Sequence, residues 1–287
     1  MASSPDRWIV STDWLAGHLT DPGHVILDGS MHLPTSGRSA RAEHAAAHIP
    51  GAQYFDIDAI ADKSSPLPHM LPPPEQFGAQ VAALGISNAT RVIVYDSEGL
   101  YSAARVWWMF RAFAHDDVAV LDGGLKRWKA EGRPLTDAPT PARAPGRFAA
   151  RPRPELIRDR QDVRAAIRHD RIQIVDARAA NRFEGAVPEP RQGLRSGHIP
   201  SSRNVPFQSL LTADGTLKSA AALASVFAAA GVDPARPVVA SCGSGVTAGV
   251  VAFALAQIGQ PDAAVYDGSW TEWGGDPALP IETGKAS

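Results

Sequence analysis

The sequence predicts an α/β protein built as a tandem duplication, each copy a mainly parallel sheet with helices on both faces. Uniformly apolar runs such as HVILDGS and RPVVASCG alternate with helical patterns, which is typical of buried parallel strands. HIPGAQYFDI at His48 returns as HIPSSRNVPF at His198, and VLDGGLKRW at Val120 returns as VYDGSWTEW at Val265. Landmarks that recur in order at nearly constant spacing identify an internal repeat.

The elements of each copy follow from these patterns. Strands are expected at HVILDGS, RVIVYDS and VAVLDGG in the first copy, and at RIQIVDAR, RPVVASCG and AAVYDGS in the second. Helical patterns cover residues 74–84, 102–114, 219–230 and 246–258. In such sheets the functional groups lie at the carboxyl ends of the strands, where each strand gives way to a helix.

The length of 287 residues fits two domains. We expect the first domain to span residues 1–137 and the second to span residues 157–287. Residues 138–156 between them are rich in Pro, Ala and Arg and show no apolar period, which predicts a semi-extended linker.

The composition excludes several classes of protein. The chain has 28 Lys and Arg against 30 Asp and Glu, a net charge of −2, which is too balanced for a nucleic-acid binder. One cysteine permits no internal disulfide and no zinc site built on several cysteines. No apolar run is long enough to span a membrane, and the opening MASSPDRWIV lacks the pattern of a targeting peptide. We therefore expect a cytoplasmic protein.

The only cysteine follows a predicted strand and precedes a glycine-rich loop. The strand ends at Ser241, and Cys242-Gly243-Ser244-Gly245-Val246-Thr247 leads into a helix. Gly243 and Gly245 let the backbone turn so that several N–H groups face one point, and the helix N-terminus adds positive potential there. A thiolate is favoured in such a place, so Cys242 is predicted to be a nucleophile rather than a small buried apolar residue.

The first copy lacks this thiol. Its corresponding loop is Asp96-Ser97-Glu98-Gly99-Leu100-Tyr101-Ser102, which places an acid where the second copy has Cys242. A bulky acidic loop is unsuited to cradling an anion, so we expect the first domain to be inactive. Aspartates that recur in both copies, such as Asp28 and Asp176, are expected to fix turns.

These motifs resemble the two-domain rhodanese-like sulfurtransferases over almost the whole chain. They are DGS and HIPGA in the first copy, then DAR, GHIP, CGSGVTA and YDGSWTEW in the second. The resemblance implies that Cys242 takes a sulfur atom from a small-molecule donor, holds it as a persulfide and passes it to a thiol, thioredoxin or cyanide. It also implies a site between an inactive first domain and a catalytic second domain, without a metal or organic cofactor.

The loop sequence points to one donor within that family. Members with Cys-Gly-Ser-Gly usually take sulfur from 3-mercaptopyruvate and those with Cys-Arg-Lys-Gly from thiosulfate, and this chain has the first pattern. The resemblance assigns Arg182 and Arg191 to the carboxylate and ketone of the substrate, because guanidinium groups match planar oxygen pairs. Substrate contacts are also expected from the loop residues Gly243, Gly245, Val246 and Thr247.

A proton relay is the last feature that the resemblance implies. It pairs Ser244 with His48, and a third member, an acid, falls in a Gly-Arg-Asp stretch. This chain reads Gly37-Arg38-Ser39 there, so Glu43 is the candidate replacement. The resemblance also places the proline-rich segment Ser65–Pro72 beside the site as a rigid loop.

Three other functions are known for a cysteine in a loop of this kind. A cysteine-dependent phosphatase needs an arginine six positions after its nucleophile, and Ala248 at that position rules this class out. Thiosulfate:cyanide sulfur transfer is the enzymatic alternative, although the loop lacks the cationic pair. A non-enzymatic scaffold that uses Cys242 to sense redox state or bind persulfides would need a second thiol from a partner.

Overall fold

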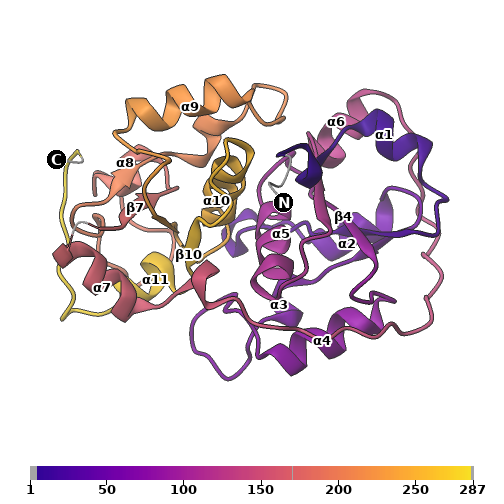
Figure 1. The fold of residues 1–287 in the computed structure, drawn as a ribbon, viewed down its shortest axis with the longest axis horizontal. Coiled ribbons are helices and arrows are strands. Elements are labelled where there is room, and N and C mark those ends of the chain that lie inside the picture. Colours follow the sequence, from indigo (N-terminus) through magenta and orange to yellow (C-terminus); the bar gives the residue numbers. More distant parts are fainter. Residues whose placement is uncertain (1–4, 170, 286–287) are drawn as a thin grey trace. The chain divides into compact units, whose positions relative to one another are not determined.

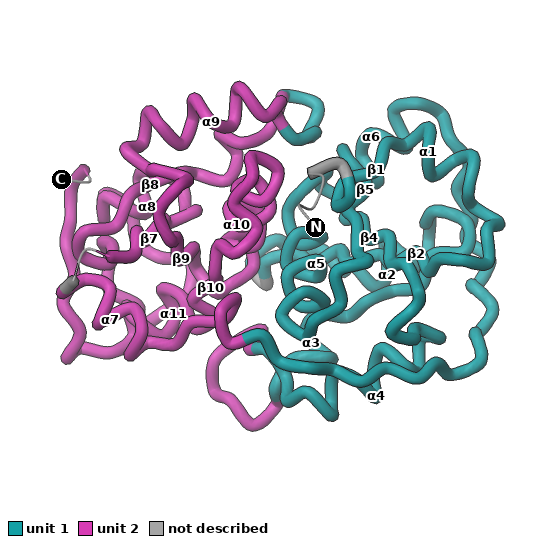
Figure 2. The backbone as a smooth tube through the Cα atoms, in the orientation of Figure 1, with its two compact units in different colours: residues 1–62, 71–153, 213–217 teal, residues 63–70, 154–212, 218–287 magenta. Residues whose placement is uncertain are grey.

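Two five-stranded parallel sheets organise the chain, one in each half of the repeat (Figure 1). The computed structural model describes residues 5–169 and 171–285. The chain divides into two compact units, which Figure 2 colours separately. Unit 1 contains residues 1–62, 71–153 and 213–217, and unit 2 contains residues 63–70, 154–212 and 218–287.

Unit 1 carries a sheet with the strand order β1-β5-β4-β2-β3. Its strands are β1 (Ile9–Val10), β2 (His24–Asp28), β3 (Ala52–Tyr54), β4 (Arg91–Tyr95) and β5 (Val118–Leu121). Its α-helices are α1 (Thr12–Gly17), α2 (Ala40–Ala46), α3 (Ile57–Ile60), α4 (Pro74–Ala83), α5 (Ala103–Ala112) and α6 (Gly124–Ala130). Short 3₁₀ turns cover Pro5–Trp8 and Pro34–Ser36.

The core of unit 1 lies on both faces of this sheet. Ile26 and Ile93 face one side and pack with Leu125 and Trp128 of α6. Neighbouring strand residues point to the opposite face, where all ten residues of α5 are buried. Because α5 is enclosed on every side, its aromatic residues belong to the hydrophobic core. Uniformly apolar strands need such a covering layer on both faces of the sheet.

Unit 2 repeats the arrangement with the strand order β6-β10-β9-β7-β8. Its strands are β6 (Ile157–Arg158), β7 (Gln173–Asp176), β8 (Arg203–Asn204), β9 (Val238–Ser241) and β10 (Ala264–Tyr266). Its α-helices are α7 (Arg160–His169), α8 (Ala180–Phe183), α9 (Ala220–Ala229), α10 (Ala248–Gln257) and α11 (Ser269–Trp273). Short 3₁₀ turns cover Pro154–Leu156 and Phe207–Leu210.

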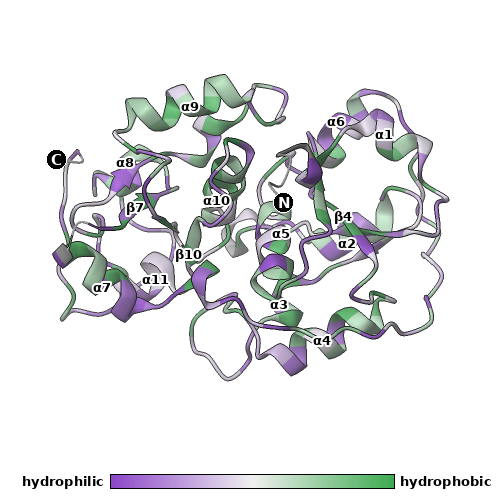
Figure 3. Cartoon of the chain, in the orientation of Figure 1, coloured by the Kyte–Doolittle hydropathy of each residue, from purple (hydrophilic) through white to green (hydrophobic). Residues whose placement is uncertain are grey.

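Helix α10 is the central helix of unit 2. All ten of its residues are buried, in keeping with its hydrophobic colouring in Figure 3. Val239 of the adjacent strand packs on the other face of the sheet, with Val163 of α7 and Trp270 of α11. The loop that carries Cys242 is therefore clamped between a fully buried strand and a fully buried helix.

The expected fold class is confirmed, and each of the six expected strands is present. The four expected helices are α4, α5, α9 and α10, each shorter than its sequence pattern by one to three residues. The pattern did not predict β1, β3, β6 and β8, which are only two or three residues long and leave no measurable period. Across the described residues, no helix is long and apolar enough to cross a membrane.

Most of the segment expected to link the domains is held along unit 1. Thr140 donates its hydroxyl to the carbonyl of Ala52 at 2.7 Å. The backbone N–H of Ala149 donates to the side chain of Asn88 at 2.8 Å, and that of Arg153 to the carbonyl of Ala112. Residues 138–153 are thus packed against unit 1 and do not form a free linker.

Candidate functional site

The site begins at the end of β9, where the strand gives way to the loop before α10. Cys242 is the first residue after the strand, and its thiol is free and only 2% exposed. Ser244, Val246 and Thr247 of the loop are also buried. Gly245 has a positive φ of 78°, the left-handed conformation that favours glycine and reverses the direction of the loop.

The repeated YDGSWTEW motif fixes the base of this loop. The backbone N–H of Cys242 donates to Ser269 Oγ at 3.1 Å, and its carbonyl accepts from the N–H of Trp270. The carbonyl of Gly243 accepts two bonds from Thr271, from its N–H at 2.9 Å and its hydroxyl at 2.6 Å. Four hydrogen bonds from the start of α11 therefore orient the nucleophile and the residue after it.

The inner side of the loop presents donors. Among the hydrogen bonds of residues 5–169 and 171–285, none is donated by the backbone N–H groups of Ser244, Val246 or Thr247. These groups precede α10, whose dipole is positive at this end. Successive free N–H groups at a helix N-terminus form a nest that binds an anion.

Unit 1 shows what such a nest binds. The Asp96 carboxylate accepts from the N–H groups of Glu98 at 2.9 Å, Tyr101 at 2.7 Å and Ala103 at 2.8 Å. Burial raises the pKa of Asp96, and these three backbone bonds act against that rise. The loop of the first copy was expected to be unsuited to an anion. It does cradle one, but the anion is its own side chain.

The repeat relates this filled nest to the open one. Asp96 corresponds to Cys242, and the donors Glu98 and Tyr101 correspond to Ser244 and Thr247. The N–H groups of Glu98 and Tyr101 therefore correspond to two N–H groups that have no acceptor among the described residues of unit 2. The counterpart of Ala103, Gly249, instead donates to the carbonyl of Val246 at 3.1 Å. The second copy differs in having a side chain at the first position that is too short to fill its own nest.

Arg182 lies directly beside the loop. It belongs to α8, and a Cβ atom placed on Gly243 would lie 3.2 Å from its Nη2 atom. Only glycine thus leaves the guanidinium its full space over the loop. The side chain of Arg182 is 24% exposed, so its charge is open to a ligand from one side.

Glu189 holds this arginine, and neither it nor Arg178 was among the residues expected at the site. Glu189 accepts from Arg182 Nη2 at 2.6 Å and from Arg178 Nη1 at 3.0 Å, with its side chain 2% exposed. Arg178 is itself buried against Asp176 and stacks on the ring of Trp270. The signal in the sequence is the Pro188-Glu189-Pro190-Arg191 run, in which an acid between two prolines has a restricted backbone and lies near several arginines.

Arg191 has a histidine for its partner. Its Nη2 atom donates to Nε2 of His69 at 3.2 Å, which requires His69 to be neutral with its proton on Nδ1. His69 is 7% exposed and has a positive φ of 62°, an uncommon conformation for a residue with a side chain. The residue lies in the predicted rigid loop of residues 65–72, and residues 65–70 of that loop belong to unit 2 with Arg191.

His48 has a different environment. Its ring accepts or donates at Nε2 with Thr140 Oγ1 at 3.3 Å and donates from Nδ1 to the carbonyl of His44 at 2.7 Å, all within unit 1. Its counterpart His198 likewise donates from Nδ1 to a carbonyl, that of Phe183, and stacks on the same residue. The two copies thus share a histidine that donates from Nδ1 to a backbone carbonyl of its own unit, and a relay role for His48 stays a prediction.

The acid expected to support His48 does not contact it. Glu43 accepts from Arg38 at 2.7 and 2.8 Å and pairs with His32 at 2.9 Å. Arg38 and His32 hold the pKa of Glu43 at about 2. Ser39, which stands where the relay acid was expected, caps α2 by accepting from the N–H of Ala42. The expected pairing of Glu43 with His48 is therefore wrong.

Comparisons with known proteins agree with this architecture. The model of the rhodanese-like domain family matches residues 11–131 and 159–276. Rat 3-mercaptopyruvate sulfurtransferase is 46% identical over 93% of this chain and 92% of its own length. A mitochondrial thiosulfate/3-mercaptopyruvate sulfurtransferase of Arabidopsis thaliana is 43% identical over 97% of this chain and 79% of its own.

A solved structure matches as well. The crystal structure of SseA from Escherichia coli, described as a 3-mercaptopyruvate sulfotransferase, superposes with a TM-score of 0.84. The match covers 92% of this chain and 98% of SseA at 42% identity. Two matched domains and relatives that are similar over nearly their whole length establish the relationship. The chain belongs to the family of proteins built from rhodanese-like domains.

Proposed function

We propose that this protein transfers the sulfur of 3-mercaptopyruvate to Cys242 and then to a nucleophilic acceptor, releasing pyruvate. The observation that carries the proposal is the juxtaposition of the Cys242 loop with Arg182, whose guanidinium lies against Gly243. A nucleophile, a nest of N–H groups and a fixed cation for a carboxylate are thus grouped within unit 2. The relatives' names supply the donor, and the Cys-Gly-Ser-Gly loop is the family pattern for that donor.

The first step is attack of the Cys242 thiolate on the sulfur of the donor. The new S–S bond forms as the C–S bond breaks, and the electron pair of that bond passes to carbon as the enolate of pyruvate. A proton, which the donor thiol gives up, then reaches this carbon and yields pyruvate. Holding the ketone oxygen lowers the barrier because the enolate carries its charge there.

The persulfide on Cys242 would be held by the nest. In unit 1 the same two backbone positions bind the two carboxylate oxygens of Asp96, one each, and each oxygen lies two bonds beyond Cβ. The outer sulfur of a cysteine persulfide also lies two bonds beyond Cβ. We infer that the N–H groups of Ser244 and Thr247 stabilise the negative charge of that outer sulfur.

Arg182 and Arg191 would bind the two ends of the α-keto acid. Arg182 is fixed by Glu189, whereas Arg191 bonds to His69 and forms no ion pair with an acid among the described residues. Ser244 would pass the donor's proton. The ring of His69, which accepts from Arg191, would hold that guanidinium in place for the substrate.

Transfer to the acceptor completes the cycle. A thiolate or cyanide attacks the outer sulfur, and the Cys242 thiolate leaves. One cysteine in the chain means that any second thiol comes from the acceptor, whether a small thiol or thioredoxin. We place this chemistry in the cytoplasm, since a reactive single thiol suits a reducing compartment. The mitochondrial Arabidopsis relative makes cell fractionation the direct check of that placement.

Thiosulfate is the second candidate donor. The Arabidopsis relative's name includes both donors, and the nest with Arg182 would suit a dianion. The loop, however, offers no side-chain cation of its own between Cys242 and Ala248. A dianionic donor would thus rely on backbone donors and the two arginines, so we expect thiosulfate to be the poorer substrate.

One set of assays tests the proposal. Pyruvate release from 3-mercaptopyruvate and thiocyanate formation from thiosulfate are measured for wild type, Cys242→Ser, Arg191→Ala, Ser244→Ala and Gly243→Arg. Cys242→Ser should abolish both, and the wild type treated with donor alone should gain the mass of one sulfur atom. Arg191→Ala and Ser244→Ala should slow mercaptopyruvate turnover more than thiosulfate turnover. Turnover of neither donor by wild type would refute the enzyme and favour the redox or persulfide scaffold.

A further inference from the structure

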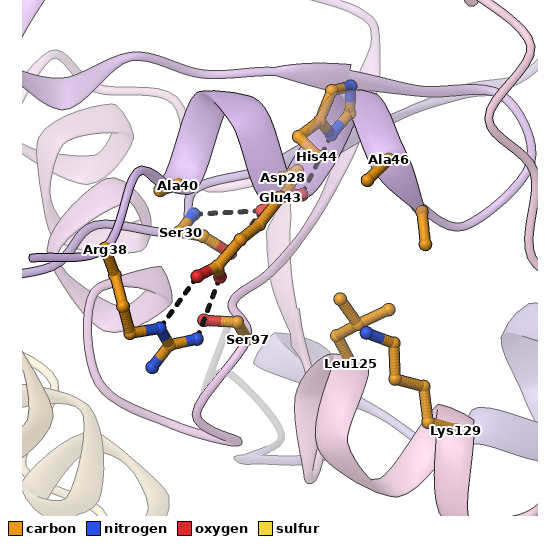
Figure 4. Close-up of a pocket in the computed structure, with 11 residues that line it drawn as sticks. Asp28, Ser30, Arg38, Ala40, Glu43, His44, Ala46, Ser97, Leu125 and Lys129 are labelled. Carbon is orange, nitrogen blue, oxygen red and sulfur yellow. Dashed lines mark hydrogen bonds and ion pairs between the residues drawn. The ribbon is translucent and has the colours of Figure 1, made fainter.

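A pocket of about 290 Å³ lies within unit 1, at the carboxyl ends of its strands, and none of its lining residues is among those proposed for sulfur transfer. It is formed by the end of β2, the Asp96 loop, α2 and α6, and Figure 4 shows the side chains that line it. Asp28 and His44 lie on one side, and Leu125 and Lys129 of α6 face α2 across the space. This volume is at the lower end of the range for small-molecule sites.

Unit 2 fills the corresponding space with an arginine. Arg178 follows Asp176 by two residues and donates to both of its carboxylate oxygens, from Nε at 3.0–3.1 Å and Nη2 at 2.7 Å. Its Nη2 also donates to the carbonyl of Gly197 at 2.8 Å. The guanidinium stacks over the ring of Trp270, 4.3 Å from its centre. An acid, a carbonyl and an aromatic face thus enclose one buried cation.

Unit 1 keeps the acid, replaces the aromatic ring with an aliphatic side chain and lacks the cation. The repeat pairs Asp176 with Asp28 and Arg178 with Ser30, so a short hydroxyl side chain replaces the guanidinium. Trp270 corresponds to Leu125, which lines the pocket. The carbonyl-bearing residue before the histidine, Gly197 in unit 2, is the pocket residue Ala47 in unit 1.

The acid at the base of the pocket is buried. Asp28 is 1% exposed and accepts from the N–H and hydroxyl of Ser30 and from His44 Nδ1 at 2.9 Å, and the Tyr95 hydroxyl also interacts with it. No arginine or lysine pairs with it among the described residues. A carboxylate that is buried with only neutral donors and one histidine is an attractive partner for a further cation.

The other charged groups of the pocket are at its rim. Arg38 is bound to Glu43 and Glu98, so its charge is compensated within unit 1. Lys129 is exposed at the opposite edge and has no ion pair among the described residues. Ser97 lines the same space, and its buried hydroxyl has no partner among the described residues. The pocket therefore offers a carboxylate at its base and an ammonium at its mouth.

We propose that this pocket binds a small guanidino acid. The guanidinium group takes the place that Arg178 occupies in unit 2, bonded to Asp28 and packed on Leu125, with the Ser97 hydroxyl as an additional acceptor. The carboxylate at the other end of the molecule faces Lys129. A planar guanidinium matches a carboxylate with two parallel charged bonds; an ammonium lacks this planar geometry and a urea group lacks the charge.

Isothermal titration of the full chain with L-arginine tests this, with L-citrulline as the neutral isostere and methylguanidinium as the minimal probe. L-Arginine should bind with one-to-one saturation, and L-citrulline at least about tenfold more weakly, because the charged hydrogen bonds are lost. Lys129→Gln should weaken the binding of L-arginine but leave the affinity for methylguanidinium unchanged. Glu75→Gln, which removes an exposed acid outside the pocket, is the matched control and should change neither.

Two variants address the base of the pocket. Asp28→Asn should weaken L-arginine at least about tenfold. Ser30→Arg supplies the guanidinium from the chain itself, as Arg178 does in unit 2, and should abolish binding. Thermal unfolding and circular dichroism show whether each variant is folded. If Asp28→Asn does not fold, the binding result for Ser30→Arg tests the proposal. Equal affinity for L-citrulline, unchanged binding in Ser30→Arg, no saturation at about 10 mM, or tighter binding of inorganic phosphate than of L-arginine would each overturn the proposal.

Discussion

Both carboxylate oxygens of Glu189 accept hydrogen bonds from Arg182, one from Nε at 3.2 Å and the other from Nη2 at 2.6 Å. The same carboxylate pairs with the buried Arg178, so one acid sets the position of two guanidinium groups. Arg178 is enclosed in the core of unit 2, whereas Arg182 reaches the Cys242 loop. The core thereby orients the cation that is proposed to bind substrate.

Replacing Glu189 should therefore affect both stability and activity. Glu189→Gln leaves Arg178 with one charged partner, and we expect the free energy of unfolding to fall by about 3 kcal/mol, measured by urea denaturation. Arg182 loses its orientation, and KM for 3-mercaptopyruvate should rise about tenfold while kcat changes less. Glu155→Gln, an exposed acid of the same unit, is the control. An unchanged KM would show that Arg182 does not depend on Glu189.

A methyl group on Gly243 should disturb the same arginine. The Cβ atom would lie 3.2 Å from Arg182 Nη2, so the guanidinium must shift by a few tenths of an ångström. We expect Gly243→Ala to lower kcat/KM for 3-mercaptopyruvate about threefold. A Cβ atom at Gly17 would have no atom within 4 Å, so the control Gly17→Ala should leave kcat/KM unchanged. Equal kinetics for the two variants would separate Arg182 from the reaction.

The two histidines can be told apart by kinetics. His69→Gln removes the acceptor of Arg191 and should lower kcat/KM for 3-mercaptopyruvate about tenfold. His48→Gln breaks a bond to the carbonyl of His44 in unit 1, so it should lower the melting temperature and leave the kinetics of the folded fraction near wild type. The reverse result would restore the relay that the sequence suggested.

Glu43 gives stability a pH dependence with a defined sign. The hydrogen bonds of Arg38, and secondarily the contact with His32, lower the pKa of Glu43 from an ordinary 4.5 to about 2. A carboxyl whose pKa is lower in the folded state stabilises the protein above its unfolded pKa, and the contribution is lost as pH falls toward the folded value. The stability difference between wild type and Glu43→Gln should thus be larger at pH 7 than at pH 3.5 in urea titrations. A constant difference would mean that the ion pairs are screened by solvent.

Local patterns in the sequence predicted most of the fold. The apolar runs predicted β2, β4, β5, β7, β9 and β10, since each strand is buried on both faces and must be uniformly apolar. The offset between the copies also located Cys242 and the acid that replaces it. Strands of two or three residues were not predicted, because so short a segment has no period and exists only through its hydrogen bonds to a neighbouring strand.

Side-chain contacts between residues far apart in the sequence are evident only in the structure. His69 lies 122 residues before Arg191, and nothing local to either residue indicates that they meet. The acid proposed for His48 was chosen by nearness in sequence, yet Glu43 lies on α2 with its carboxylate turned to Arg38 and His32. Side-chain pairing depends on direction and burial, which the spacing of residues along a chain does not encode.

By itself the sequence determined that the protein is a duplicated α/β unit with one thiol, at the end of one strand and before one glycine-rich loop. Only the tertiary structure decided what fills the equivalent spaces of the two units. In unit 1 the nest is occupied by Asp96 and the space beside Asp28 is open, whereas in unit 2 the nest is open and Arg178 occupies that space. The physical reason is that a cavity or a free donor results from several side chains together, and each of these residues alone is an ordinary substitution.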